Sequence, residues 1–347
     1  MVSNSNVSNI AVSCHTAAAV VTTLAGSGIQ GNANGTGTAA SFNYPEHIAV
    51  DTSGNVYVAD SGNNLIRKVT PTGVVTTLAG SGIQGNANGT GTAASFNNPG
   101  GVTVDVSGNV YVADFRNNLI RKITPAGMVT TLAGDGSHNS ANGIGTAASF
   151  AFPGDVTVDA AGNVYVADVS NYMIRKITPA GLVTTYAGIG SPALPLYGNG
   201  PANTASFALP DSVAVDALGN VYVADTGNNS IRKITAAGMV SSLAGDLYAN
   251  SGSANGTGTA ATFSAPTGVA VDASGNVYVS DSGNNLIRKI TAAGVVTTIA
   301  GNASDTSING TGTAAGFRNP VGVAVDSSGN LYVSDSGSHL IRKISAQ

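Results

Sequence analysis

The chain has 347 residues, of which only 9% are charged, and its formal net charge is -4. Because a nucleic-acid interface needs a surplus of lysine and arginine on one face, this balance argues against a DNA or RNA partner. No run of 18 apolar residues exists, so we predict no membrane insertion, and the single Cys14 excludes an intramolecular disulfide and a cysteine-based zinc cluster.

The first segment, residues 1–16, matches nothing else in the chain. It resembles the closing strand of a small β-sandwich module. We therefore predict a remnant of a preceding module at 1–16 and a single domain over 17–347. On this interpretation the chain is the C-terminal part of a larger protein, and any signal peptide lies upstream of it.

The rest of the chain is an internal repeat, marked by the pattern Phe-x-x-Pro. The pattern begins at residues 42, 96, 150, 207, 263 and 317, so the copies are 54 to 57 residues apart. Residues 20–43 and 74–97 are identical, which indicates a recent duplication. The fold is therefore built from six similar units.

Each copy predicts four short strands, exemplified by residues 101–105, 109–114, 65–69 and 74–80. These segments are rich in β-branched residues and are separated by Gly, Pro and Asn turns, which is typical of an all-β fold. One further helical turn is expected at the Thr-Ala-Ala-Ser-Phe segment that precedes each copy's proline.

Six copies of four strands predict an all-β, six-bladed β-propeller of four-stranded antiparallel blades. The last copy ends at 344–347, after its third strand, and the missing fourth strand occurs at the start of the domain as 20–26. We expect this N-terminal strand to complete the last blade and close the ring, which also covers exposed strand edges. A stack of β-coils is the rival architecture, but it prefers shorter repeats.

The segment Pro266–Thr291, with its Gly-Val-Ala-Val-Asp and Asn-Val-Tyr-Val core, resembles the NHL repeat. The resemblance covers about residues 17–347 and implies a propeller, but that family includes RNA-binding, protein-binding, sensor and enzymatic members, so it says little about function. One departure is visible, because the position after Asn-Asn is often Arg in the family. Here it is Leu65, Leu119, Met173, Ser230, Leu286 and Leu340.

Most charged residues recur in every copy, so we assign them to the scaffold. Twelve of the 14 basic residues form an Arg-Lys pair on each third strand, and 12 of the 18 acidic residues end the first or second strands. The aspartates are expected to accept backbone N–H bonds in the turns or to pair with arginine. A functional basic ring is the alternative. The repeated tyrosines, Tyr57 to Tyr332, are expected to pack within blades.

Residues that differ between copies are the candidates for function. In a propeller, the turn between strands two and three shares a face with the long connection into strand one, and residues just after Phe-x-x-Pro lie near the channel mouth. On that face we expect one ligand-binding cluster. Its candidate members are Glu46, His47, Phe115, Arg116, Asp155, Tyr172, Asp211 and His339.

The chemistry of this cluster leaves several roles open. His47, His339, Glu46 and Asp155 are the candidate ligands of a divalent metal, which would activate water or polarise a carbonyl. Glu or His would serve as a general base and Tyr172 as an acid. Arg116 would hold a carboxylate or sulfate, and Phe115 and Tyr172 would stack on a sugar or an aromatic ring. Drift between duplicated turns is the alternative for every member.

Two connections add apolar residues to the same face, at Ser191–Tyr197 and Asp246–Tyr248. Such residues are typical of binding surfaces, although packing against a neighbouring loop explains them equally well. His138 and His15 lie outside the cluster and are expected to be incidental.

From these features we expect an extracytoplasmic bacterial binding or scaffold module, secreted, periplasmic or on the cell surface. It would be a monomeric propeller that recognises a glycan, a peptide or a protein on the long-connection face. The alternative is a metal-dependent hydrolase or lyase, lactonase-like, with its site at the channel mouth. The sequence requires no cofactor for the binding module. The alternative function, a hydrolase or lyase, would need a divalent metal.

Overall fold

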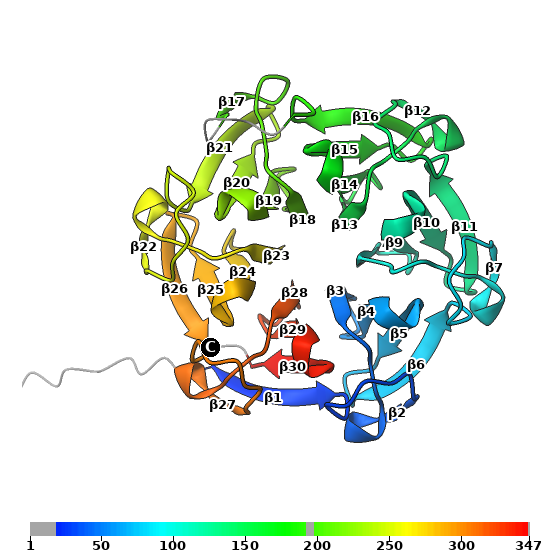
Figure 1. Cartoon of the computed structure of the whole chain (residues 1–347), viewed down its shortest axis with the longest axis horizontal. Helices are drawn as coiled ribbons and strands as arrows, with labels where there is room; N and C mark the ends of the chain where they lie inside the picture. The colour runs from blue at the N-terminus through cyan, green and yellow to red at the C-terminus, as the bar shows by residue number, and fades with distance from the viewer. Residues whose placement is uncertain (1–18, 192–197, 346–347) are drawn as a thin grey trace, which may run out of the picture.

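The computed structural model describes residues 19–191 and 198–345, and these form six blades around a central axis (Figure 1). The all-β propeller is therefore confirmed. The remnant predicted at 1–16 and most of the connection Ser191–Tyr197 lie outside the described residues. No helix among the described residues is long and apolar enough to cross a membrane.

The blades run from an innermost strand at the channel to outer strands at the rim (Figure 1). The innermost strands are β3 (Pro45–Val50), β8 (Gly101–Val104), β13 (Pro153–Val158), β18 (Pro210–Val215), β23 (Pro266–Val271) and β28 (Pro320–Val325). The second strands are β4 (Val56–Asp60), β9 (Val110–Asp114), β14 (Val164–Asp168), β19 (Val221–Asp225), β24 (Val277–Asp281) and β29 (Leu331–Asp335). The third strands are β5 (Leu65–Val69), β10 (Leu119–Ile123), β15 (Met173–Ile177), β20 (Ser230–Ile234), β25 (Leu286–Ile290) and β30 (Leu340–Ile344).

The fourth strands complete each predicted blade, and one of them comes from the start of the chain. They are β6 (Val74–Ala79), β11 (Met128–Ala133), β16 (Leu182–Ala187), β21 (Met239–Ala244), β26 (Val295–Ala300) and β1 (Val20–Ala25). Strand β1 pairs antiparallel with β30, with Val21 opposite Ile344 and Thr22 opposite Lys343. The predicted closure of the ring by the N-terminal strand is confirmed.

One feature of the blades differs from the prediction, because each sheet has five strands rather than four. The fifth strand is only two residues long and lies outside the fourth. These strands are β2 (Gly35–Thr36), β7 (Gly89–Thr90), β12 (Gly143–Ile144), β17 (Gly200–Pro201), β22 (Gly256–Thr257) and β27 (Gly310–Thr311). A segment this short carries no readable period-2 pattern, so sequence reasoning could not detect it.

Single 3-10 turns connect the strands at two places in the repeat. One follows the fifth strand, as at Gly37–Ala39, close to the expected Thr-Ala-Ala-Ser-Phe turn. The other lies between the second and third strands, as at Ser61–Asn63 and Phe115–Asn117. The N–H of Gly62 donates to the carbonyl of Asn43, so this turn lies on the same face as the long connection, as predicted.

The core lies between neighbouring blades rather than within one. Tyr57, Ala59 and Ile66 of the first blade pack against Val102 and Val110 of the second, for example, and one fully buried phenylalanine sits in each such layer. At about 25 cal/mol per Å² of apolar surface, these layers supply most of the drive for folding. Figure 1 shows the resulting arrangement, in which every blade touches two others.

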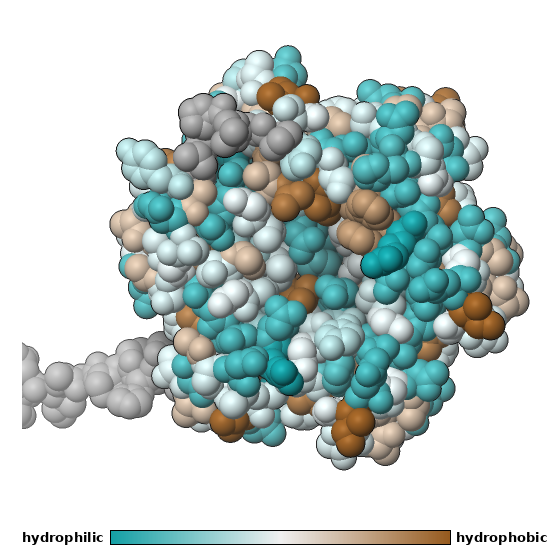
Figure 2. Space-filling view, in the orientation of Figure 1, coloured by the Kyte–Doolittle hydropathy of each residue, from teal (hydrophilic) through white to brown (hydrophobic). Residues whose placement is uncertain are grey.

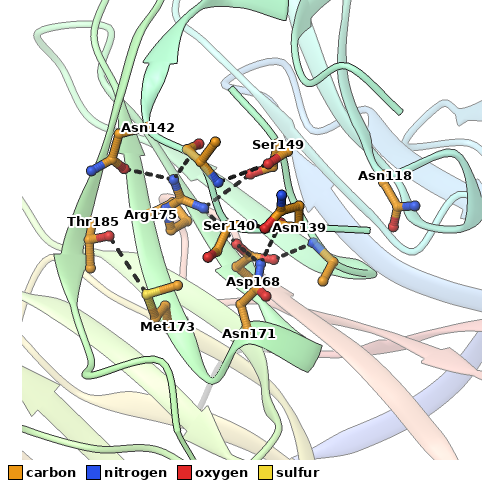
Figure 3. Close-up of polar contacts among 12 residues, drawn as sticks. Asn118, Asn139, Ser140, Asn142, Ser149, Asp168, Asn171, Met173, Arg175 and Thr185 are labelled. Atoms are coloured by element: carbon orange, nitrogen blue, oxygen red, sulfur yellow. Dashed lines mark hydrogen bonds and ion pairs between the residues drawn. The ribbon is translucent and has the colours of Figure 1, made fainter. Parts of the chain in front are cut away.

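The recurring charges are structural, as expected. In each blade, the third-strand arginine is fully buried and ion-paired with the aspartate that ends the second strand. Figure 3 shows one case: Arg175 binds Asp168 at 2.9 Å, the Asn142 side chain at 2.8 Å and the Ser149 carbonyl at 3.1 Å. The arginine thus ties its strand to the long connection, and it forms no basic ring on the surface.

The turn aspartates and the repeated tyrosines are also confirmed as scaffold. Asp51 accepts the backbone N–H groups of Ser53 and Asn55, and the Tyr57 hydroxyl donates to the same carboxylate at 3.1 Å. Burial and this carboxylate raise the pKa of Tyr57 to about 12. The tyrosine therefore stays protonated and acts as a hydrogen-bond donor within its blade.

Neighbouring blades are also joined by a hydrogen bond on the long-connection face. The residue after the 3-10 turn between the second and third strands has positive φ and is usually asparagine, whose side-chain oxygen accepts a backbone N–H from the next blade. Asn118, for instance, accepts from Phe152 at 2.9 Å. Asparagine suits both demands, since it tolerates the left-handed region and carries an amide oxygen.

Tyr172 stands at the same place in the third blade, with φ of 56°, and offers no amide oxygen to Leu209 of the fourth. We expect Tyr172→Asn to raise the free energy of unfolding by about 1 kcal/mol, because it relieves a strained backbone and adds a hydrogen bond. Thermal unfolding of the variant tests this. The matched change Asn118→Tyr should lower stability, and equal melting temperatures for all three proteins would contradict the interpretation.

Candidate functional site

The central channel opens on the long-connection face into a hollow of about 280 Å³. In Figure 1 the long connections cross in front of the blades, so Figure 2 shows this face, with apolar side chains gathered beside the central hollow. The lining of the hollow comes from the four blades whose innermost strands are β3, β8, β13 and β18, which are blades one to four in chain order. The residues are Glu46, His47, Ser61, Asn98, Gly100, Phe115, Arg116, Gly154 and Asp211.

Two successive positions after each repeated proline build the channel wall. The first positions are Glu46, Gly100, Gly154, Asp211, Thr267 and Val321, and the second are His47, Gly101, Asp155, Ser212, Gly268 and Gly322. Several must be glycine, because the inner strands approach one another closely here. A Cβ on Gly101 would lie 2.6 Å from the Cα of Asp155, and one on Gly322 would lie 2.7 Å from the Cα of His47.

His47 lies in the wall of the channel, where it lines the hollow. It is buried, and its Nε2 lies 3.5 Å from the Asp211 carboxylate, which belongs to the fourth blade, opposite the first. The same histidine lines a second cavity of about 270 Å³, which is walled by the innermost strands. His47 is the residue that the linings of the two cavities share.

Asp155 lies beside His47 and is also buried. The hydroxyl of Ser212 donates to Asp155 Oδ2 at 2.6 Å, and the backbone N–H of Val213 donates to the same oxygen at 3.4 Å. The N–H of Val269 in turn donates to the Ser212 oxygen at 3.3 Å. This chain of hydrogen bonds fixes the carboxylate across three blades, so its charge is held at one place.

The charges around His47 shift its titration and that of Glu46. Burial alone would lower the pKa of His47, but Asp155, Asp211 and Glu46 outweigh it and raise this pKa to about 9. Burial raises the pKa of Glu46 to about 7, with His47 opposing the shift and Asp211 adding to it. Burial also raises the pKa of Asp155, although His47 and Ser212 oppose it. At neutral pH the imidazole is therefore a cation among three carboxyl groups.

Since the pKa of His47 is higher in the folded protein, protonation of this residue stabilises the fold fully below pH 6.5, and this contribution is lost as the pH rises through about 9. We expect Asp155→Asn to lower the pKa of His47 by roughly one unit or more, because it removes the strongest favourable charge. NMR titration of the imidazole measures this. The control Asp305→Asn removes an exposed carboxylate paired with Arg318 and should leave the pKa of His47 unchanged. An unaltered pKa in Asp155→Asn would contradict the assignment.

Of the eight residues predicted from the sequence, five line the hollow at the channel mouth and a sixth lines the second cavity. Glu46, His47, Phe115, Arg116 and Asp211 line the hollow, and Asp155 lies with His47 at the second cavity. The two others lie elsewhere. Tyr172 caps its turn outside both cavities, and His339 lines a separate hollow of about 500 Å³ with Arg318.

His339 takes the place of the inter-blade asparagine between blades six and one. Its Nδ1 accepts the backbone N–H of Tyr44 at 3.1 Å, and the two rings meet edge to face with centroids 4.7 Å apart. Burial and Arg318 lower the pKa of His339, which keeps Nδ1 free to accept. These contacts give His339 a part in joining the ends of the ring.

A metal requires several ligands that converge on one point, and this was expected of His47, His339, Glu46 and Asp155. Within residues 19–191 and 198–345, no group of three or more His, Cys, Asp or Glu side chains is arranged to hold a metal ion. The residues present therefore do not fit the metal that the alternative function needs.

Sequence reasoning missed one aromatic residue next to Phe115 and set another, His138, aside as incidental. Phe152 stacks on Phe115 with ring centroids 5.0 Å apart, and His138 leans on Phe152 at 4.9 Å. The position before the proline varies among the copies as Tyr44, Asn98, Phe152, Leu209, Ala265 and Asn319, and its φ is positive in all of them. That variation is a signal of the same kind as the turn residues, and it could have identified Phe152.

The chain is similar in sequence to known proteins that contain NHL repeats. Five segments match the model of the NHL repeat, at 42–69, 96–123, 207–234, 263–290 and 317–344. The third copy, which carries Val169-Ser-Asn-Tyr172 at its turn, is not among them. The chain is also 28% identical to NHL repeat-containing protein 2 of Bos taurus over 86% of its own length and 46% of that protein. It spans less than half the length of the curated relatives that it matches first.

Two solved structures share the architecture. An auxiliary nutrient binding protein from Bacteroides ovatus is 17% identical, with a TM-score of 0.71 over 95% of this chain and 77% of that one. Virginiamycin B lyase from Staphylococcus aureus is 14% identical, with a TM-score of 0.53 over 87% and 95% of the two chains. At these identities the likeness shows the fold alone.

Proposed function

The chain is an NHL-repeat β-propeller, and on that basis we propose that it is a binding module whose ligand enters the hollow on the long-connection face. One observation carries the proposal: side chains that differ from their counterparts in the other blades meet in this hollow. Glu46, His47, Phe115, Arg116 and Asp211 all break the repeat, and all five line it. The residues that recur in every blade, by contrast, build the scaffold.

The ligand we propose is a glycan, a peptide or a protein segment that places one small polar unit, such as a single sugar or side chain, in the hollow. The volume of the hollow, about 280 Å³, lies just below the usual range for ligand pockets, about 300–1,000 Å³. We propose a monomeric, extracytoplasmic bacterial protein, since low charge and a single cysteine suit that setting. The similar nutrient-binding propeller from Bacteroides ovatus agrees with a binding role.

The alternative, a metal-dependent hydrolase or lyase at the channel mouth, has less support. A buried His47 among carboxyl groups is suited to proton transfer, but the described residues lack a converging ligand set for the metal. The lyase from Staphylococcus aureus shares the fold only.

The repeat itself supplies a conservative test of the binding site. Phe115→Ser with Arg116→Gly gives the second blade the Ser-Gly-Asn-Asn turn that is present at residues 61–64 and 282–285. We expect this variant to fold. We expect its affinity for any glycan or peptide that binds the wild type on an array to fall at least roughly tenfold, because the variant removes an aromatic face and a cation.

Arg318→Asn is the matched control, because it removes another exposed arginine from the same face and installs the asparagine found at positions 43 and 97. It should bind like the wild type. Retention of every array signal by the double variant would show that the hollow is not the binding site.

A further inference from the structure

Arg116 is the one arginine at the hollow, and it is exposed. Each third-strand arginine is paired with an aspartate, and Arg318 is paired with Asp305 at 3.3 Å. In the described parts of the chain, by contrast, the Arg116 guanidinium has no hydrogen bond or ion pair, although its backbone N–H donates to Asn97. Glycine occupies this place in four other blades, at 62, 227, 283 and 337. A free guanidinium beside a cavity is suited to a carboxylate, which it binds through two parallel hydrogen bonds.

Phe115 offers a flat apolar surface next to this guanidinium. Its ring stacks on Phe152 with an interplanar angle of 26°, and the backbone N–H of Phe152 is held by Asn118. Phe152 has φ of 51°, a conformation that asparagine adopts with less strain at positions 98 and 319. A strained aromatic residue that supports another aromatic residue at a cavity suggests a platform fixed in advance for stacking.

Glu46 and Asp211 supply hydrogen-bonding oxygens at the base of the hollow, on blades one and four. Asp211 has one oxygen 3.5 Å from His47, and its side chain remains about a quarter exposed, at 28%. The carboxyl of Glu46 changes protonation near neutral pH, so it both accepts and donates hydrogen bonds there. Groups that accept from and donate to a ligand in this way are suited to hydroxyls, which do both.

We propose that the hollow binds an acidic sugar, with the sugar carboxylate on Arg116, one face of the pyranose ring on Phe115, and ring hydroxyls on Glu46 and Asp211. This inference rests on the proposed function, because it names the ligand class of the same hollow. The volume of about 280 Å³ holds one sugar unit, so a single terminal or side-chain uronate is recognised.

A free amino acid also carries a carboxylate, and the geometry favours it less. Its ammonium only donates hydrogen bonds and gains most from fully ionised acceptors. Here Glu46 is already partly protonated at neutral pH, and His47 neutralises part of the charge of Asp211. The sugar also uses the Phe115 platform, which an amino acid reaches only if it carries an aromatic side chain, so L-phenylalanine is the most demanding competitor.

Titration calorimetry at pH 7 with D-galacturonate, its methyl ester, D-galactose and L-phenylalanine tests the proposal. We expect the wild type to bind galacturonate at least roughly tenfold more tightly than the ester or the neutral sugar, since only the free acid forms the charged pair. Arg116→Gly should remove this preference by weakening the binding of galacturonate. Phe115→Ser should weaken both sugars, and Arg318→Asn should weaken neither.

Equal affinity for the acid and its ester, or an unchanged preference in Arg116→Gly, would overturn the proposal. So would binding of phenylalanine in place of galacturonate, or binding of none of the four probes. These outcomes are separable from failure of the site itself. If the array gives another ligand that is lost in Phe115→Ser with Arg116→Gly, the ligand class is wrong and the hollow remains the site.

Discussion

Replacing Arg121 with methionine should lower the free energy of unfolding by about 3–5 kcal/mol, one of the largest effects of any single substitution in this chain. The guanidinium is fully buried and donates to Asp114, to the Ser95 and Ala87 carbonyls, and to Asn88, at distances of 2.8 to 3.2 Å. Methionine keeps most of the contact with the Phe96 ring, whose centroid lies 5.4 Å from the guanidinium carbon. The loss is therefore electrostatic, because an unpaired carboxylate is left inside the blade.

Two variants separate this cause from simple loss of packing. The double change Arg121→Met with Asp114→Asn removes both charges, so it should cost less than Arg121→Met alone. Arg318→Asn breaks an exposed pair of the same chemical type, which lies at 3.3 Å, and should cost no more than about 0.5 kcal/mol. The midpoints of urea unfolding measure all three. A loss in Arg121→Met as small as that in Arg318→Asn would contradict the role we give to the buried pair.

Much of the scaffold could be predicted from the sequence because the repeat compares the chain with itself. The third strand expected at 65–69 is observed at Leu65–Val69, and the strand at 20–26 is observed as Val20–Ala25 in the last blade. Arg67 and Lys68 are neighbours on one strand, so they point to opposite faces, and both were assigned to the scaffold from the sequence without being separated. Alternation did not tell which of the two is buried, since that depends on the neighbouring blade.

The candidate site was harder to predict, since it depends on which loops meet in space. Blade-specific residues after the proline were found from the sequence because the titratable side chains at these positions have small or uncharged counterparts in most other copies. Phe152 was missed because its partner Phe115 lies 37 positions away in another blade, and no periodicity connects the two. His339 was taken for a possible metal ligand, whereas its Nδ1 replaces the amide oxygen that asparagine supplies elsewhere.

A disulfide across the ring closure should stabilise the propeller far more than the same disulfide inside one blade. Thr22 and Lys343 are directly opposite on β1 and β30, so their Cα atoms lie within the span that a disulfide bridges. Thr22→Cys with Lys343→Cys, in a Cys14→Ser background, closes a loop of roughly 320 residues, for which the chain-entropy relation gives about 6 kcal/mol. Melting temperatures of the oxidised and reduced protein measure the gain.

The duplication supplies an unusually close control, because β6 has the same sequence as β1. Thr76 is opposite Lys68 as Thr22 is opposite Lys343, and each lysine lies over a tyrosine ring, at 5.4 and 5.7 Å. Thr76→Cys with Lys68→Cys therefore loses the same contacts but closes a loop of only about 9 residues, worth about 2.5 kcal/mol. The difference of about 3 kcal/mol isolates the entropy of bringing the two ends of the domain together. Failure of the two cysteines introduced on β1 and β30 to oxidise in the folded protein would mean that β1 does not occupy the last blade, and equal gains for the two pairs would mean that closure does not constrain the unfolded chain.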